Sequence, residues 1–574
     1  MRVAKPPRNL RLVKLKPCHS ITPMMPGSPL VTASKEHSVW NLFPVLLLAL
    51  LVVLLLCVFL FAPVTVTLDG YSHLYGAAAL RWMLGGQPEA HSNFSYNSVL
   101  VPNWVCAFLL AALSSIVSNE WALKLLVVLI GMALLSSLYF CIDPTLYQPH
   151  QRAQVLIALL PFALNAFLAL GYYGFLISSS LCIFVLGLLL RHGLSMSLRM
   201  QCVAACFLLL AYFSHPLPVI ISFLFPFALF MADTIIYLRE GWRRSATALK
   251  RLAFYIWPWM PPACLLPWFY LRLSKVAEPR PDSIMSKVTQ RTLALARDAV
   301  PSISPTADVA TLFVALLSIL LAGVILCRRK LLVQNRFRFT SLTVLMVSTL
   351  VLFLTVPDAV GDGTDIAKRV LLYSAIFLVL LALSSGVFDA QLLTLSSLIA
   401  AISVIGFAGE YLVVSKRLAP AVAEVRLAME SLPRHSRILI MGYRMTPSSC
   451  DGSPLLQMSV PERHWALIGA LKNELIVLND YEAYTTYFPL ESLTSRYADV
   501  QDEVDLSSEQ DRAVWFNILK SDPDVDFVVS WGVSRRANCT NAVYPPFEEA
   551  LKTRHDMVFF KQGASRVELW RKRQ

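Results

Sequence analysis

The sequence has little charge for its length, and this shortage excludes an ordinary soluble protein. Only 15% of its 574 residues are charged, whereas 56% are hydrophobic and the mean hydropathy is +0.58. Soluble domains usually carry about 25% charged residues, and a single soluble core cannot enclose so much apolar surface. The composition therefore predicts a polytopic α-helical membrane protein.

The sequence also lacks several motifs that would indicate other classes of protein. It has no CxxC and no HExxH spacing, so it predicts neither a structural zinc site nor a zinc protease of that kind. It has no internal repeat, whereas many secondary transporters are built from inverted repeats. A transporter stays an alternative, but the sequence does not favour it.

Long apolar runs are abundant, and each is a candidate membrane helix. They lie near Leu42–Val66, Trp121–Ile142, Ala153–Leu170, Phe175–Leu190, Gln201–Ser214, Leu217–Leu238, Ala253–Leu271, Val309–Leu326, Ser341–Val356, Val370–Val387 and Gln391–Leu412. About forty polar residues precede the first run and no small-residue cleavage site follows it, so we expect a retained helix and not a signal peptide. The sequence predicts about eleven spans.

Positive charge is concentrated in the N-terminal tail and in two loops, although the formal net charge of the whole chain is +13. These segments contain Arg2, Lys5, Arg8, Arg11, Lys14, Lys16 and Lys35; Arg239, Arg243, Arg244, Lys250 and Arg251; and Arg328, Arg329, Lys330, Arg336 and Arg338. Such clusters between apolar runs mark the cytoplasmic side, so nucleic acid is not an expected partner. If Val105–Val117 is a short helix at the outer leaflet, the C-terminus lies outside.

The character of the chain changes near Ser415, where charge becomes frequent and no spanning run remains. We expect residues 1–41 to form a basic cytoplasmic tail, 42–414 a transmembrane domain with a first outer loop at 67–104, and 415–574 an extracytoplasmic α/β domain. Its predicted strands are Arg437–Met441, Glu474–Leu478, Phe527–Trp531, Met557–Lys561 and Arg566–Trp570, and its predicted helices are Glu462–Lys472, Gln510–Lys520 and Pro546–Lys552. Its two cysteines, Cys450 and Cys539, are predicted to form a disulfide in an oxidising compartment.

With this topology, polar residues from distant parts of the chain meet at the outer face. They are Asp69, His73, Tyr172, Tyr173, His215, Asp358, Asp362, Asp365, Lys368 and Arg369. An ionisable residue at membrane depth is costly to place there and is therefore a candidate for function.

The order of these motifs resembles the GT-C superfamily of membrane glycosyltransferases. The resemblance lies in "TLDGYSHLYGAAALRWMLGG", "VPNWVCAFLLAALSSI", "LGYYGFLISSSLCIF", "YFSHPLPVI", "VPDAVGDGTDIAKRVLLYSAIF" and, in the outer domain, "YTTYFPL". It is greater to a bacterial branch than to the protein mannosyltransferases, whose first-loop acidic pair is here Asp69 followed by Gly70. The resemblance implies an inverting glycosyltransferase of the bacterial inner membrane and cell envelope. The implied donor is a polyprenyl-phosphate sugar, and the acceptor is a glycan, lipid or protein.

The resemblance further implies that Asp69 is the catalytic carboxylate, which accepts the proton of the attacking group or holds that group in position. The alternative is that Asp69 caps a helix starting at Tyr71, because Asp is a favoured N-cap residue. His73 would share a helix face with Asp69 and orient it or bind substrate, or be a satisfied interfacial histidine.

Lys368 and Arg369 open a span from the outer side, where the resemblance implies contact with the carrier phosphate; the alternative is a snorkelling anchor. Asp362 and Asp365 ligate a divalent ion or balance these cations. Since the acidic pair of the metal-dependent oligosaccharyltransferases is missing, no obligatory metal or other cofactor is expected. His215, Tyr172 and Tyr173 either line the acceptor cavity or are structural and interfacial residues. A non-catalytic membrane scaffold remains a second alternative.

Overall fold

The computed structural model describes most of the chain after the N-terminal tail. The described residues are 42–239, 245–273, 316–325, 336–359, 365–384, 390–442, 462–485, 488–493, 496–497, 513–515, 517–519, 524–532, 551–562 and 566–573. The predicted disulfide partners Cys450 and Cys539, and also Asp362, lie outside these residues.

Among the described residues, seven helical segments are long and apolar enough to cross a membrane. They are α1 (Phe43–Phe61), α5 (Asn119–Cys141), α8 (Tyr173–His192), α10 (Pro216–Ser222) continued by α11 (Leu224–Arg239), α16 (Arg336–Thr355), α17 (Ile366–Leu383) and α18 (Ala390–Glu430). Shorter helices beside them are α4 (Trp104–Ile116), α6 (Pro149–Ala163), α9 (Leu198–Ser214), α12 (Ser245–Ile256), α13 (Met260–Leu273) and Leu316–Ile325. The polytopic helical fold is confirmed, whereas the count of eleven spans is not.

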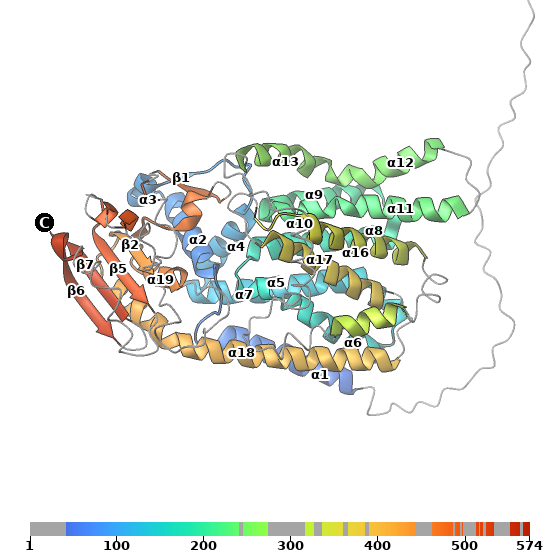
Figure 1. The fold of residues 1–574 in the computed structure, drawn as a ribbon, viewed down its shortest axis with the longest axis horizontal. Coiled ribbons are helices and arrows are strands. Elements are labelled where there is room, and N and C mark those ends of the chain that lie inside the picture. The colour runs from blue at the N-terminus through green and yellow to red at the C-terminus, as the bar shows by residue number, and fades with distance from the viewer. Residues whose placement is uncertain are drawn as a thin grey trace, which may run out of the picture.

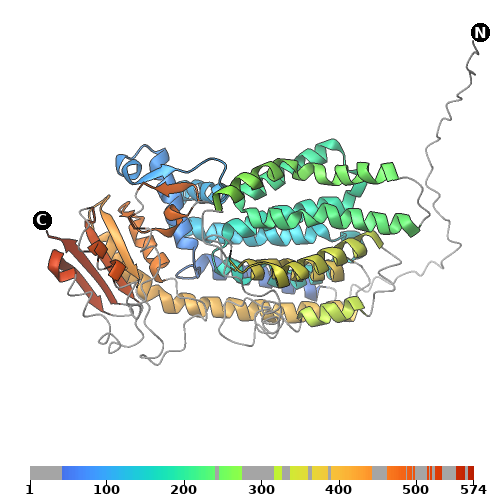
Figure 2. The same cartoon turned by 45° about the horizontal axis from the view of Figure 1, so that its top comes forward.

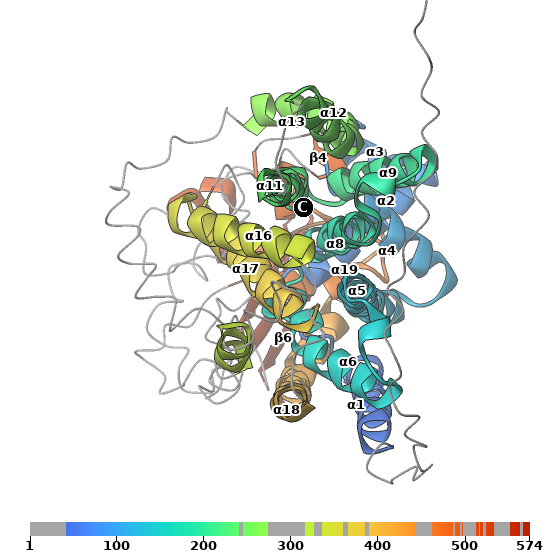
Figure 3. The same ribbon diagram turned by 90° about the vertical axis from the view of Figure 1, so that its right-hand side faces the viewer.

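The helices run side by side along the long axis of the molecule (Figure 1). Seen along that axis, α8 and α17 lie toward the middle of the bundle, with α1 and α18 at one edge and α12 and α13 at the other (Figure 3). Burial agrees, since 83% of the spanning residues of α8 and α17 are buried but only 28% of those of α1. The exposed Leu46, Leu50 and Phe61 of α1 form the kind of apolar surface that faces lipid.

The two ends of the bundle differ in charge and in the elements that cover them. At one end Arg191 donates to the carbonyls of Phe140 and Ile142, and Arg338 donates to that of Leu190. The sheet domain covers the other end (Figure 1). Basic residues opposite the sheet are what the positive-inside rule expects if the sheet lies outside, and this orientation remains a prediction.

The C-terminal region forms a five-stranded sheet in the order β3-β2-β5-β7-β6. Its strands are β2 (Arg437–Gly442), β3 (Ile476–Val477), β5 (Phe527–Gly532), β6 (His555–Gln562) and β7 (Arg566–Lys572). The first three pair in parallel, whereas β7 pairs antiparallel with β5 and β6. Each of the five predicted strands is thus found, and α19 (Glu462–Ala470) confirms the first predicted helix of this domain. Of the other two predicted helices, residues 513–515, 517–519 and 551–552 are described and helical, and the rest lie outside the described residues.

The helix α18 joins the bundle to the sheet domain without a break. It runs for 41 residues from Ala390 to Glu430 and ends beside the sheet (Figure 2). The domain boundary expected at Ser415 therefore lies inside a continuous helix. Ser415 itself is buried there and exchanges hydrogen bonds with the backbone of Val64, just after α1.

The segment predicted to be the first outer loop is folded and is joined to the sheet domain. It contains α2 (Gly70–Leu84), α3 (Pro88–Asn93) and β1 (Phe94–Tyr96), and β1 pairs antiparallel with β4 (Leu490–Ser492). The Tyr75 hydroxyl donates to the carbonyl of Leu475 at 3.1 Å and accepts from the amide of Val477 at 2.7 Å. These contacts hold the sheet domain on α2. The predicted short helix Val105–Val117 is found as α4.

Candidate functional site

The candidate site is built where the segment before α2 meets the turn before α8. The amide of Leu68 donates to the carbonyl of Ala169 at 2.9 Å, and that of Asp69 to the carbonyl of Leu170 at 3.1 Å. Gly171 has φ +79°, and a Cβ there would lie 2.7 Å from the Gly70 nitrogen. Only glycine suits this conformation and this close approach.

Replacing Gly171 by Ala is therefore expected to destabilise the fold by about 2 kcal/mol or more, because a left-handed residue acquires a Cβ against backbone atoms. Thermal unfolding of the purified protein measures this. Gly131→Ala is the matched control, since a Cβ at Gly131 in α5 has no neighbour within 4 Å among the described residues. Equal unfolding temperatures for the two variants would contradict the expectation.

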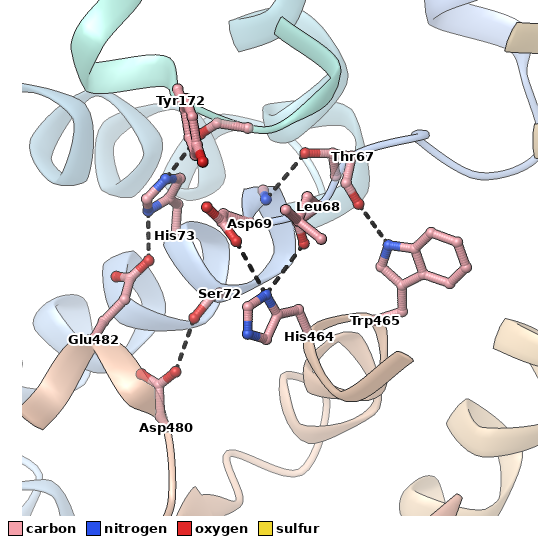
Figure 4. Close-up of polar contacts among 12 residues, drawn as sticks. Thr67, Leu68, Asp69, Ser72, His73, Tyr172, His464, Trp465, Asp480 and Glu482 are labelled. Carbon is pink, nitrogen blue, oxygen red and sulfur yellow. Dashed lines mark hydrogen bonds and ion pairs between the residues drawn. The ribbon is translucent and has the colours of Figure 1, made fainter. Parts of the chain in front are cut away.

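Asp69 occupies the N-cap position of α2, but its side chain forms no capping hydrogen bond with the described chain. The Thr67 hydroxyl does this instead, accepting from the amide of Gly70 at 3.0 Å. The Asp69 carboxylate points toward α19, where its Oδ1 lies 3.2 Å from Nδ1 of His464 (Figure 4). Its side chain is 16% exposed. Because Thr67 caps α2, the Asp69 carboxylate is not bound by the helix N-terminus and can contact other groups.

The sheet domain supplies residues that the sequence did not point to. On α19, His464 faces Asp69, and Trp465 donates its indole N–H to the carbonyl of Thr67 at 2.6 Å. The His464 ring stacks on Tyr481, with centroids 4.9 Å apart and planes at 17°. Neither residue lies in a recognisable motif, so only the docking of α19 on α2 reveals them.

His73 also forms a pair with the sheet domain, through the carboxylate of Glu482 on the short helix η6 (Tyr481–Tyr484). Its Nδ1 faces Glu482, and its Nε2 lies 2.9 Å from the carbonyl of Gly171 (Figure 4). Burial of the ring opposes a positive charge, but Glu482 outweighs it and raises the pKa of His73 to about 9. His73 is thus an imidazolium with two protein partners, and its role in catalysis stays a prediction.

The raised pKa predicts how stability changes with pH. An unfolded histidine titrates near about 6.5, so the pair stabilises the fold fully below that pH and loses its contribution as pH rises through about 9. We expect the unfolding temperature of the wild type to fall more between about pH 6.5 and about pH 9 than that of a Glu482→Gln variant. Thermal unfolding over this range tests it, with the exposed His192→Gln as control; parallel curves for wild type and Glu482→Gln would contradict it.

A second cluster centres on Arg369 in α17, whose side chain is buried. Its guanidinium carbon lies 4.0 Å from the centre of the Tyr172 ring, and its Nη1 lies 3.1 Å from Nε2 of His215. Its Nε is buried and has no hydrogen-bond partner among the described residues. A buried donor without a partner is costly, and an anion is the ligand that a guanidinium binds best.

Lys368 differs from its neighbour because it is exposed and already paired. Its Nζ lies 2.9 Å from Oδ1 of Asp365, whose Oδ2 accepts from the Tyr172 hydroxyl at 3.1 Å. Asp365 has φ +56° at the start of α17. These contacts fit the alternative that Asp365 balances the cations.

The turn 169–173 connects the residues around Asp69 and His73 with the cluster around Arg369. Gly171 holds His73 through its carbonyl, and the next residue, Tyr172, lies against Arg369. Tyr173 is fully buried and donates to the Thr67 hydroxyl at 3.0 Å. The structure therefore brings all the described candidates to one end of the bundle, although Asp69 and Arg369 are 300 positions apart in sequence.

A cleft lies beside the His73–Glu482 pair, between α2, α4, η6 and β4. It encloses about 330 Å³ when its opening to solvent is included. Its walls include Tyr75, Phe94, Asp480, Glu482, Phe488 and Leu490. Aromatic rings and carboxylates therefore line the space next to the His73–Glu482 pair.

No protein-family model and no curated protein matches the chain. Two solved structures of ArnT from Cupriavidus metallidurans are similar to it: one bound to undecaprenyl phosphate and one in the apo state. Each is 12% identical to this chain with a TM-score of 0.47. The match to the undecaprenyl phosphate complex covers 92% of this chain and 97% of that structure's chain. The match to the apo structure covers 93% of this chain and 98% of that structure's chain. Similarity at this level assigns no role to any residue, so the roles proposed below rest on this chain's own side chains.

Proposed function

We propose that the chain is an inverting glycosyltransferase that moves a sugar from a polyprenyl-phosphate donor to an acceptor at the outer face of a bacterial inner membrane. The observation that carries this proposal is that Asp69 and Arg369 lie on either side of the turn 169–173, which contacts the neighbours of both. A carboxylate that does not cap its helix and a buried cation with a spare donor lie at the same end of the bundle. General-base transfer from a phosphate leaving group needs these two groups.

In the proposed reaction the acceptor hydroxyl attacks the anomeric carbon from the face opposite the phosphate. Asp69 takes the hydroxyl proton as the new C–O bond forms. The bond between the anomeric carbon and the phosphate oxygen breaks, and its electron pair leaves with the polyprenyl phosphate. Arg369 stabilises the charge that develops on that oxygen, and attack from the opposite face inverts the configuration.

The scaffold and transporter alternatives explain the buried charges less well. Burying a guanidinium costs free energy unless its donors are satisfied, and in a scaffold the Nε of Arg369 would keep no partner among the described residues. A phosphate would satisfy it. A transporter would place its binding residues near the midplane, whereas these residues lie at one end of the helices.

Incubation of the purified protein with polyprenyl-phosphate sugars and a panel of envelope glycans, lipids and proteins tests the proposal. Release of polyprenyl phosphate together with a glycosylated acceptor would support it, and a product of inverted configuration would support the mechanism. Release of the lipid without any acceptor product, or no turnover with the whole panel, would reject it in favour of a scaffold.

A further inference from the structure

We propose that the sheet domain completes the catalytic centre and that His464 is a positioning residue for Asp69. In this arrangement His464 holds one oxygen of the Asp69 carboxylate, so that the other is directed at the acceptor hydroxyl. This role rests on the proposed function. It assigns to the outer domain a direct part in the chemistry.

The contacts of His464 fix which ring nitrogen carries its proton. Nδ1 lies 3.2 Å from Oδ1 of Asp69 and 3.3 Å from the carbonyl of Leu68. Both are acceptors, and a backbone carbonyl can never donate, so Nδ1 must carry the hydrogen. This N–H donates to the carbonyl of Leu68, and the same nitrogen lies 3.2 Å from Oδ1 of Asp69, so the N–H edge of the ring faces the carboxylate.

The ring that donates is itself held firmly. It stacks on Tyr481, and its neighbour Trp465 anchors α19 to the carbonyl of Thr67, two residues before Asp69. The contact of α19 with α2 and the β1–β4 pairing fix the domain on the same loop. A donor on a rigid element can hold a carboxylate in one rotamer.

Asp69 needs such a partner because its backbone position alone does not orient it. An N-cap aspartate is usually held by the amides of its own helix, but the Thr67 hydroxyl accepts the amide of Gly70 instead. The carboxylate would otherwise rotate about χ1 and χ2. A shift of about 1 Å in a reacting group can cost 10²-fold in rate, so loss of the donor should be felt in turnover.

The test compares three variants at His464 in the full-length protein. His464→Ala should lower kcat by roughly 10- to 100-fold with the KM for the donor within about twofold, since Asp69 and not the phosphate site is disturbed. His464→Asn places an amide N–H near the position of Nδ1 and should recover most of the loss. His464→Gln places its amide nearer the position of Nε2 and should not. The control is His435→Asn, which removes a histidine beside Glu474 elsewhere in the same domain and should leave kcat unchanged.

These variants distinguish a positioning role of His464 from a role through titration and from no role in turnover. If the wild type is active and His464→Ala is equally active, this positioning role is wrong and the proposed function stands. If His464→Asn is as slow as His464→Ala while both unfold at the wild-type temperature, the ring acts through titration and not through N–H donation, which also overturns it. A wild type that transfers no sugar would overturn both the proposed function and this role.

Discussion

Replacing Asp69 by Asn is expected to lower turnover by roughly 10²–10⁴-fold while donor binding stays intact. Asparagine keeps the shape of the side chain, and its carbonyl oxygen can still lie against Nδ1 of His464. It cannot take a proton from the acceptor hydroxyl at neutral pH. The variant therefore removes the base without changing the shape of the side chain.

Single-turnover transfer and equilibrium binding of a polyprenyl-phosphate sugar measure the two effects separately. The matched control is Asp358→Asn, an exposed aspartate in the segment between α16 and α17, which should keep the wild-type rate. A variant at Asp69 with more than about a tenth of wild-type turnover would show that no general base acts there. Equal loss in both variants would instead indicate a general effect of surface charge.

Those elements of the fold that depend on a short run of residues are predictable from the sequence. The five strands were predicted from short runs rich in β-branched and aromatic residues, such as Phe527–Trp531, bounded by charged residues. The sequence does not predict the continuation of α18, because charge becomes frequent after Ser415, beginning with Lys416 and Arg417. These two residues are exposed, whereas Leu418, Ala421 and Val425 are buried. This spacing is that of a helix with one face buried and the other exposed.

The candidate site was predictable only for residues whose position in the topology marks them. Asp69 follows the first span, and Arg369 is a cation at the predicted outer end of a span, against the positive-inside tendency. His464 and Glu482 lie about 400 positions from the side chains they meet, and both lie outside "YTTYFPL", the motif quoted from this domain. Their relevance arises only when α19 and η6 dock on α2, and a single sequence carries no signal for that packing.

Replacing Arg369 by Ala is expected to weaken donor binding by about 10- to 100-fold and to lower turnover as well, because one cation contacts the phosphate before and during bond breaking. Hydrogen bonds to charged groups contribute about 1.5–3 kcal/mol, which gives this range. Arg369→Lys should recover only part of the loss, since an ammonium keeps the charge but lacks the planar fork that engages two phosphate oxygens.

The exposed neighbour Lys368 separates this role from that of an anchor at the lipid surface. Lys368 already pairs with Asp365, so Lys368→Ala should weaken donor binding by less than Arg369→Ala does. Binding of polyprenyl phosphate without a sugar measures the phosphate contact directly, and the exposed Arg191→Ala, at the opposite end of α8, is the control for loss of an arginine. If Arg369→Ala binds polyprenyl phosphate like the wild type, the buried guanidinium is structural. The cation must then act through its contacts with Tyr172 and His215, and the leaving phosphate has to be stabilised by other groups.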